Sequence, residues 1–168
     1  MITSIKCIIY LFIFVFTISS CHSQNKSINL IVIVNDKLEI GAINNTRLKI
    51  VNMDGAIEVF KVTYYPGDLI IPEIVLDKLK NKYVKYFYIL MDHYEYCGEE
   101  TIIHNYDLQM YPAWLEQPFL VFRFYNMDKE RIRKRFDPLE GKDYTYEVDL
   151  ASNSILRARK MGDMDDCK

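Results

Sequence analysis

The sequence has few residues that break secondary structure and no large excess of charge of either sign. Only 6 Gly and 5 Pro occur in 168 residues, without any low-complexity tract, which excludes collagen-like, linker-like and repeat architectures. The formal net charge is -2, whereas a nucleic-acid-binding domain usually carries a clear basic excess. We therefore expect no nucleic-acid partner, and the 50% hydrophobic content predicts a folded globular chain.

Sequence motifs for catalysis are also missing. The chain contains no glycine-rich phosphate loop, no GxSxG elbow, no HExxH and no paired CxxC. Its carboxylates are many, but the sequence singles out no pair as an acid/base dyad. We therefore expect a protein that is not an enzyme, with a hydrolase too divergent to recognise as the alternative.

The amino-terminal segment has the pattern of a secretory signal. Lys6 supplies one positive charge, and the range 7–18 is almost wholly apolar but shorter than the roughly 20 residues of a membrane-spanning helix. It ends in Ile18-Ser19-Ser20-Cys21, which resembles the lipobox of bacterial lipoprotein precursors. The resemblance implies that the signal peptide 1–20 is removed and that Cys21 is acylated, which anchors the protein to a membrane. An ordinary cleaved signal or a signal anchor is the alternative.

The residues after the lipobox indicate the location of the mature protein. The tether 21–27 is short and polar, and it lacks both the acidic cluster of some surface-exported lipoproteins and the aspartate that retains others in the inner membrane. We therefore expect attachment to the outer membrane, facing the periplasm. The range 28–160 contains no linker-like stretch and is expected to form one domain, followed by a flexible acidic tail over 161–168.

Hydrophobic alternation with a period of two dominates the expected domain. The clearest case is 144–150, where apolar and polar residues alternate without interruption. A helix competes only at 72–81, where a proline occupies the first turn and Val75 and Leu79 are four residues apart. The predicted strands cover 28–34, 47–51, 57–65, 69–71, 83–96, 101–110, 119–125, 131–136, 144–150 and 154–159.

Short strands separated by turn residues favour an all-β fold, an antiparallel β-sandwich with one short helical turn near 73–80. The pattern resembles immunoglobulin-like or transthyretin-like sandwiches of small envelope lipoproteins, although the Cys and Trp spacing of a true immunoglobulin domain is missing. Trp114, which lies in an irregular connection between two prolines, is expected to fill part of the core. Such a fold does not determine a function by itself.

One hairpin contains the candidate site. A two-residue loop at Gly98 and Glu99, of type II′, sets apolar residues opposite one another on the core face and places His93 opposite His104. Glu95 follows His93 on the same face. Imidazole and carboxylate ligands suit Zn²⁺ or Cu²⁺, so these three residues are a candidate metal site; no other cofactor is expected. The alternative is a histidine pair that packs its rings and hydrogen-bonds to water.

Two cysteines remain after the signal peptide and the lipidation site are set aside. Cys97 and Cys167 form an even pair in an oxidising compartment, so a disulfide between them is one interpretation and two free thiols are the other. The bridge would close about 70 residues and contribute on the order of 4 kcal/mol in the loop-entropy model. A catalytic pair of Cys97 and His104 is not expected, because the sequence indicates no activating group.

Two features are candidate surfaces for a partner. The first is the basic cluster of Arg131, Arg133 and Arg135, which alternation places on one face of a strand, suited to an acidic partner or simply to solvent. The second is the high content of tyrosine, 13 residues in all, which reflects strand propensity or a binding face. We therefore expect a lipoprotein that binds another envelope macromolecule. A metal-binding module using His93 and His104, and a periplasmic inhibitor or immunity protein, are the alternatives.

Overall fold

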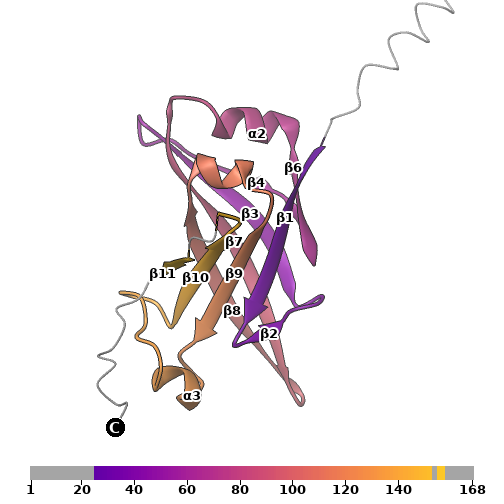
Figure 1. Ribbon diagram of the computed structural model, residues 1–168, viewed down its shortest axis with the longest axis vertical. Helices are drawn as coiled ribbons and strands as arrows, with labels where there is room; N and C mark the ends of the chain where they lie inside the picture. The colour runs from indigo at the N-terminus through magenta and orange to yellow at the C-terminus, as the bar shows by residue number, and fades with distance from the viewer. Residues whose placement is uncertain (1–24, 153–154, 158–168) are drawn as a thin grey trace, which may run out of the picture.

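A computed structural model describes residues 25–152 and 155–157, and in it two β-sheets pack face to face (Figure 1). The seven-stranded sheet has the order β11 (Ile155–Arg157), β10 (Tyr144–Leu150), β9 (Leu120–Asn126), β1 (Asn25–Val34), β6 (Gly67–Pro72) and β5 (Thr63–Tyr65), and β2 (Lys37–Leu38) also pairs with β1. The four-stranded sheet has the order β4 (Ile57–Lys61), β3 (Ile43–Asn52), β7 (Val84–Cys97) and β8 (Glu100–Met110). The helical segments of the described chain are α2 (Glu73–Leu79), η1 (Pro112–Glu116) and α3 (Glu130–Arg133). The predicted β-sandwich with a short helix is confirmed.

The core lies between the two sheets and follows from the alternation of each strand. In β1, Leu30 and Val32 are fully buried, and in β7 Phe87 and Ile89 occupy the corresponding inward positions. Trp114, within η1, is buried in the same core cluster, as expected. No helix within the described residues is long and apolar enough to cross a membrane.

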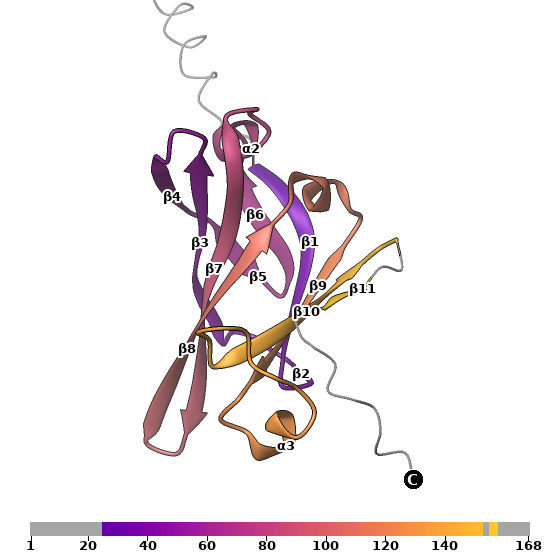
Figure 2. The same cartoon turned by 90° about the vertical axis from the view of Figure 1, so that its left-hand side faces the viewer.

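The two ends of the sandwich carry different elements, and Figure 2 shows both. One end, here called the α2 pole, holds α2 and the beginning of β1, because Asn25 pairs with Pro72 at the last position of β6. The opposite end, the hairpin pole, holds the turn between β7 and β8 together with α3. Since β1 begins at Asn25, residues 25–27, which the sequence assigned to the tether, already belong to the sheet.

One strand pairing departs from the predicted antiparallel arrangement. β1 and β9 run parallel, with Leu30 opposite Leu120 and Val34 opposite Phe124. The chain reaches β9 only after it has built the whole four-stranded sheet, so a long connection is available for a parallel return. β1 is therefore covered on both edges, by β9 on one side and by β6 and β2 on the other.

The predicted strand 57–65 is two strands in different sheets. Val62 separates β4 from β5, and its buried side chain marks the point where the chain crosses from the four-stranded to the seven-stranded sheet. Its backbone N–H donates to the carbonyl oxygen of Thr46 at 3.1 Å. Because apolar side chains continue through the crossing, the sequence pattern alone does not reveal it.

The predicted strand 131–136 is wrong, because this segment contains the helical turn α3. The backbone N–H of Phe136 donates to the carbonyl oxygen of Ile132 at 2.9 Å. Ile132 and Phe136 are both buried, in a small cluster with Tyr125 and Met127. Two apolar residues four positions apart share a face in a helix as well as in a strand, which is why alternation was misleading here.

Candidate functional site

The predicted register of the β7–β8 hairpin is confirmed. Phe87 lies opposite Met110 and His93 lies opposite His104. Gly98 has a φ of 67° whereas Glu99 does not have a positive φ, which is the combination that a type II′ turn requires. The loop sequence therefore determined which side chains meet across the two strands, including the histidines.

The two histidines pack as a stacked pair at the hairpin pole. Their ring centroids are 5.7 Å apart with an interplanar angle of 21°. Tyr106, two positions along β8, is nearly parallel to His104 and stacks on Phe124 of the other sheet at 4.1 Å. The histidines thus continue the aromatic packing of the core to its polar end.

Each imidazole faces a different carboxylate. His93 Nε2 is 3.4 Å from Glu39 Oε2, and His104 Nε2 is 3.3 Å from Glu95 Oε2. His93 is only 4% exposed, and its Nδ1 is buried with no hydrogen-bond partner in the described structure. Burial lowers the pKa of His93 and outweighs the opposing effect of the Glu39 carboxylate, so this imidazole favours the neutral form.

The predicted metal ligands are brought together only in part. Donor atoms of Glu95, His104 and Asp128 all lie within 4.8 Å of one another, whereas His93 is not a member of this group. The loop between β9 and α3 supplies Asp128, and nothing in the sequence connected this aspartate with the hairpin. No motif or spacing signals the contact, because it depends on how the two sheets pack.

A lysine already pairs with both carboxylates of this cluster. Lys129 Nζ is 2.6 Å from Glu95 Oε1 and 3.1 Å from Asp128 Oδ2. The hydrogen bond from Lys129 lowers the pKa of Glu95, and the same bond raises the pKa of Lys129. Both groups therefore remain charged at neutral pH, and the ammonium group competes with any metal ion for the two carboxylates.

An open cavity of about 650 Å³ lies next to His93. It is formed by β7, by the end of β1 with β2, and by the start of α3. Its lining mixes both signs of charge and includes Lys37, Glu39, His93, Glu95, Lys129 and Arg131. Polar groups from three separate parts of the chain converge here, as in many ligand pockets, although few apolar side chains line it.

The predicted basic face does not form, because its residues lie on and after α3. Arg131 and Arg135 both approach the carboxylate of Asp36, at 3.2 Å and 3.4 Å, and Arg131 also donates to the carbonyl oxygen of Asn35. Arg133 is exposed. Two of the three arginines therefore fasten α3 to the turn between β1 and β2, and a role in partner binding stays a prediction.

Tyrosines of β7 lie on the outer face of the four-stranded sheet. Tyr86 and Tyr88 of β7 point outward and contact each other edge to face, with centroids 5.6 Å apart. Strand register places Val51 between Tyr86 and Ile57, and Lys49 between Tyr88 and Val59. We call the outward set the β4–β7 patch; it comprises Lys49, Ile57, Val59, Tyr86 and Tyr88.

The cysteine predictions remain open. Cys97 is exposed at the end of β7, with its Sγ 3.8 Å from Glu95 Oε1. Cys167 and the proposed lipidation site Cys21 lie outside the described residues, as does the acidic tail.

Comparison of the chain with protein-family models, curated proteins and solved structures finds no match.

Proposed function

We propose that this protein is a lipoprotein of the bacterial cell envelope, anchored through an acylated Cys21, that binds another envelope protein without catalysing a reaction. The lipobox-like sequence Ile18-Ser19-Ser20-Cys21 supports the anchor. The observation that carries the binding role is the β4–β7 patch, which presents aliphatic side chains on β4 and aromatic side chains on β7, with Lys49 of β3 between them.

The composition of this patch resembles that of protein interfaces. Ile57 is 59% exposed and Val59 is 54% exposed, whereas Phe60, which points the other way from the same strand, is partly buried against the core. Tyrosine is enriched where proteins dock, since its ring supplies apolar area and its hydroxyl supplies a hydrogen bond. Large exposed apolar side chains grouped on one face mark a candidate docking surface.

The patch also ends at a strand edge that can accept a partner. β4 is the terminal strand of its sheet, and within the described residues no strand pairs with its outer edge. Such an edge presents free backbone N–H and C=O groups, which natural proteins either protect or use for strand addition. We therefore favour a partner that contributes an extended segment with alternating apolar side chains.

A photo-crosslinking experiment tests the binding role. The full chain carries a benzophenone amino acid in place of Val59, and a matched chain carries it in place of Thr101, an exposed strand residue near the hairpin turn. We expect one defined envelope protein to crosslink at Val59 but not at Thr101, and the crosslink to disappear when Tyr88→Ala is added. Equal crosslinking at both positions, or none at Val59, would contradict the role of the patch.

The identity of the crosslinked protein distinguishes an adaptor from an inhibitor or immunity protein. A structural component of an envelope machine indicates the first, and a toxin or hydrolase indicates the second. The anchor is tested separately by mass spectrometry of the mature amino terminus. An unmodified Cys21, or cleavage at another position, would refute it.

A second candidate function is metal binding at the hairpin pole. The observation that favours it is the group formed by Glu95, His104 and Asp128, whose two carboxylates and one imidazole suit Zn²⁺. A metal ion would have to displace the ammonium group of Lys129 from Glu95. This competition makes the candidate readily testable.

Zinc titration of the purified full-length protein provides the test. If the cluster binds zinc, His104→Ala abolishes the affinity and Lys129→Met increases it, because the competing cation is gone. Cys97→Ser is the matched control, since an exposed thiol near Glu95 can bind zinc by itself. Affinity that is lost in Cys97→Ser and unchanged in Lys129→Met would exclude the cluster.

A further inference from the structure

The described chain begins at the α2 pole. Asn25, the first residue of β1, pairs with Pro72, and Pro72 is the residue that directly precedes α2. Figure 1 shows the start of β1 beside α2, whereas the β7–β8 turn and α3 lie at the far end. Any anchor that precedes β1 is therefore connected to this pole.

The distance between the anchor and the domain is short. Cys21 precedes Asn25 by only four positions, and a fully extended chain of that length spans at most about 14 Å. If Cys21 is acylated, as the proposed function holds, its lipid chains lie in a bilayer whose surface is within that reach. The α2 pole is then the part of the described domain held closest to the membrane.

Three large apolar or aromatic side chains are exposed at this pole. Ile74 of α2 is 69% exposed, Tyr83 after α2 is 60% exposed, and Met53 between β3 and β4 is 68% exposed. The backbone N–H of Met53 donates to the carbonyl oxygen of Tyr83 at 2.8 Å, so these two segments are neighbours. Three separate segments thus present apolar side chains at the end to which the anchor is connected.

The charges around these side chains balance. The exposed charged residues within three positions of Met53, Ile74 or Tyr83 are Asp54, Glu73, Asp77, Lys80, Lys82 and Lys85, three of each sign. Lys82 Nζ lies 5.4 Å from the centre of the Tyr83 ring. Tyrosine and lysine are both favoured at the level of lipid headgroups, where the ring or aliphatic stem is buried and the polar end stays hydrated.

We infer that the α2 pole rests on the lipid bilayer, with Ile74, Tyr83 and Met53 in the headgroup region. A single amphipathic contact of this size is weak, but an acyl anchor keeps it at high local concentration. This orientation turns the hairpin pole, with its histidines and cavity, away from the membrane. Because the local charge is balanced, the contact needs no anionic lipid.

The test uses the full-length lipoprotein, purified and inserted into phosphatidylcholine vesicles. In a Cys97→Ser and Cys167→Ser background, a fluorophore is attached at Ile74→Cys or Tyr83→Cys, and at Glu99→Cys in the distant hairpin turn as the control. All three original residues are exposed, so the substitutions leave the core unchanged. Quenching by brominated lipids and by an aqueous quencher is then compared for each position.

We expect brominated lipids to quench the fluorophores at positions 74 and 83 several-fold more strongly than the fluorophore at position 99, with the reverse order for the aqueous quencher. The same result is expected in high salt and with anionic vesicles. Equal quenching at all positions, or lipid quenching only with anionic vesicles, would overturn the inferred contact. Failure of the protein to float with the vesicles would instead refute the acyl anchor, and the inference with it.

Discussion

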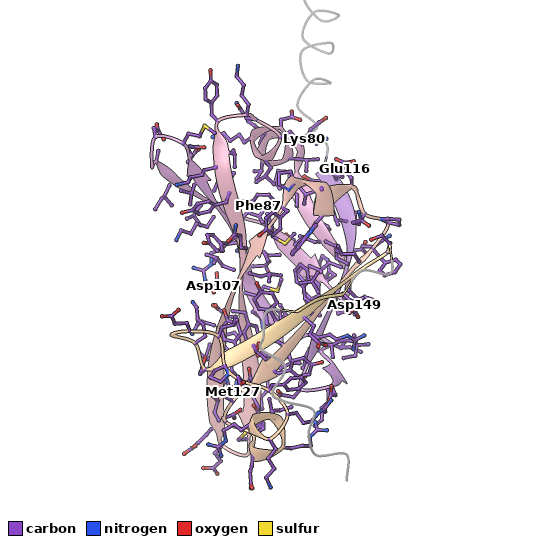
Figure 3. The ribbon with its side chains drawn as sticks, turned by 60° about the vertical axis from the view of Figure 1, so that its left-hand side comes forward. Lys80, Phe87, Asp107, Glu116, Met127 and Asp149 are labelled. Carbon is purple, nitrogen blue, oxygen red and sulfur yellow. The ribbon has the colours of Figure 1, made fainter. Side chains whose placement is uncertain are left out.

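Tyr144 and Asp107 join the two sheets through a pair of hydrogen bonds. The Tyr144 hydroxyl donates to Asp107 Oδ1 at 2.6 Å and accepts from the Asp107 backbone N–H at 2.9 Å (Figure 3 labels Asp107). Tyr144 belongs to β10 of the seven-stranded sheet and Asp107 to β8 of the four-stranded sheet. Burial raises the pKa of Tyr144, which keeps the hydroxyl protonated and able to donate.

We predict that Tyr144→Phe destabilises the fold. The change removes both hydrogen bonds and leaves Asp107 without its partner from β10, for an expected loss of about 1–3 kcal/mol in the free energy of unfolding. Urea unfolding followed by circular dichroism measures this loss. Tyr65→Phe, at an exposed strand edge, is the control and should change stability little. Equal effects of the two substitutions would contradict the role of this hydrogen-bond pair.

Asp107 should also make stability depend on pH. Burial acts to raise the pKa of Asp107, but hydrogen bonds from Lys142 and Tyr144 outweigh it and hold the pKa below its ordinary value. A carboxyl group whose pKa is lower in the folded protein than in the unfolded chain stabilises the fold at pH values above its unfolded-state pKa, about 3.9. This stabilisation is lost as the pH falls through the folded-state pKa.

Asp107→Asn should therefore lower the free energy of unfolding at pH 7 by about 1 kcal/mol, a modest value because the pair with Lys142 is partly exposed to solvent. Below pH 4 the difference between wild type and variant should shrink. Urea unfolding at several pH values measures both effects. A difference that stays constant from pH 7 to pH 2 would show that the carboxylate charge is not responsible.

The turn between β1 and β2 offers a prediction about backbone conformation. Asn35 and Asp36 have φ values of 51° and 69°, and Asn35 Oδ1 accepts a hydrogen bond from the backbone N–H of Asn126 at 2.8 Å. Asn35→Gly loses this hydrogen bond at an expected cost of about 1–3 kcal/mol. Asn35→Ala loses the same hydrogen bond and is destabilised by a further amount of about 1–2 kcal/mol, because alanine adopts the left-handed conformation less readily than glycine.

Chemical denaturation of these two variants separates the contributions. The order of stability should be wild type, then Asn35→Gly, then Asn35→Ala. Asn35→Asp is the control, because it keeps an acceptor oxygen and tolerates the left-handed region. If Asn35→Ala were as stable as Asn35→Gly, the positive φ would not be costly at this position.

The β4–β7 patch leads to a prediction that separates binding from stability. Val59→Glu should abolish binding to the crosslinked partner, because the partner would have to bury a carboxylate, and yet change the unfolding midpoint little, since the side chain points to solvent. Lys61→Glu is the matched control at an exposed position two residues along the same strand. A binding assay with purified partner and an unfolding curve are both needed. Equal loss of binding in both variants would indicate a charge effect and not a docking surface.

The parts of the fold predicted correctly are those governed by local sequence. The turn at Gly98 and Glu99 determined the register of two long strands, including the His93 and His104 pair. The strand at β10 was predicted with its bounds correct from the alternation of its sequence, although Thr145 and Glu147, at the polar positions, are buried in the structure. In these segments the determining contacts lie within one strand or between strands joined by a tight turn.

The contacts that were not predicted join residues far apart in the chain. Asp128 meets Glu95 and His104 only because the loop before α3 folds against the hairpin. In the same way, β1 pairs with β9 across most of the length of the domain. The sequence by itself determined the β-rich class, the hairpin register and the lipobox-like segment, because periodicity and turn chemistry act locally. Only the tertiary structure decided which strands pair, where α3 lies and which polar groups share the cavity. Local sequence preferences allow several strand pairings equally well, and the fold selects the pairing that buries the apolar faces of both sheets against each other.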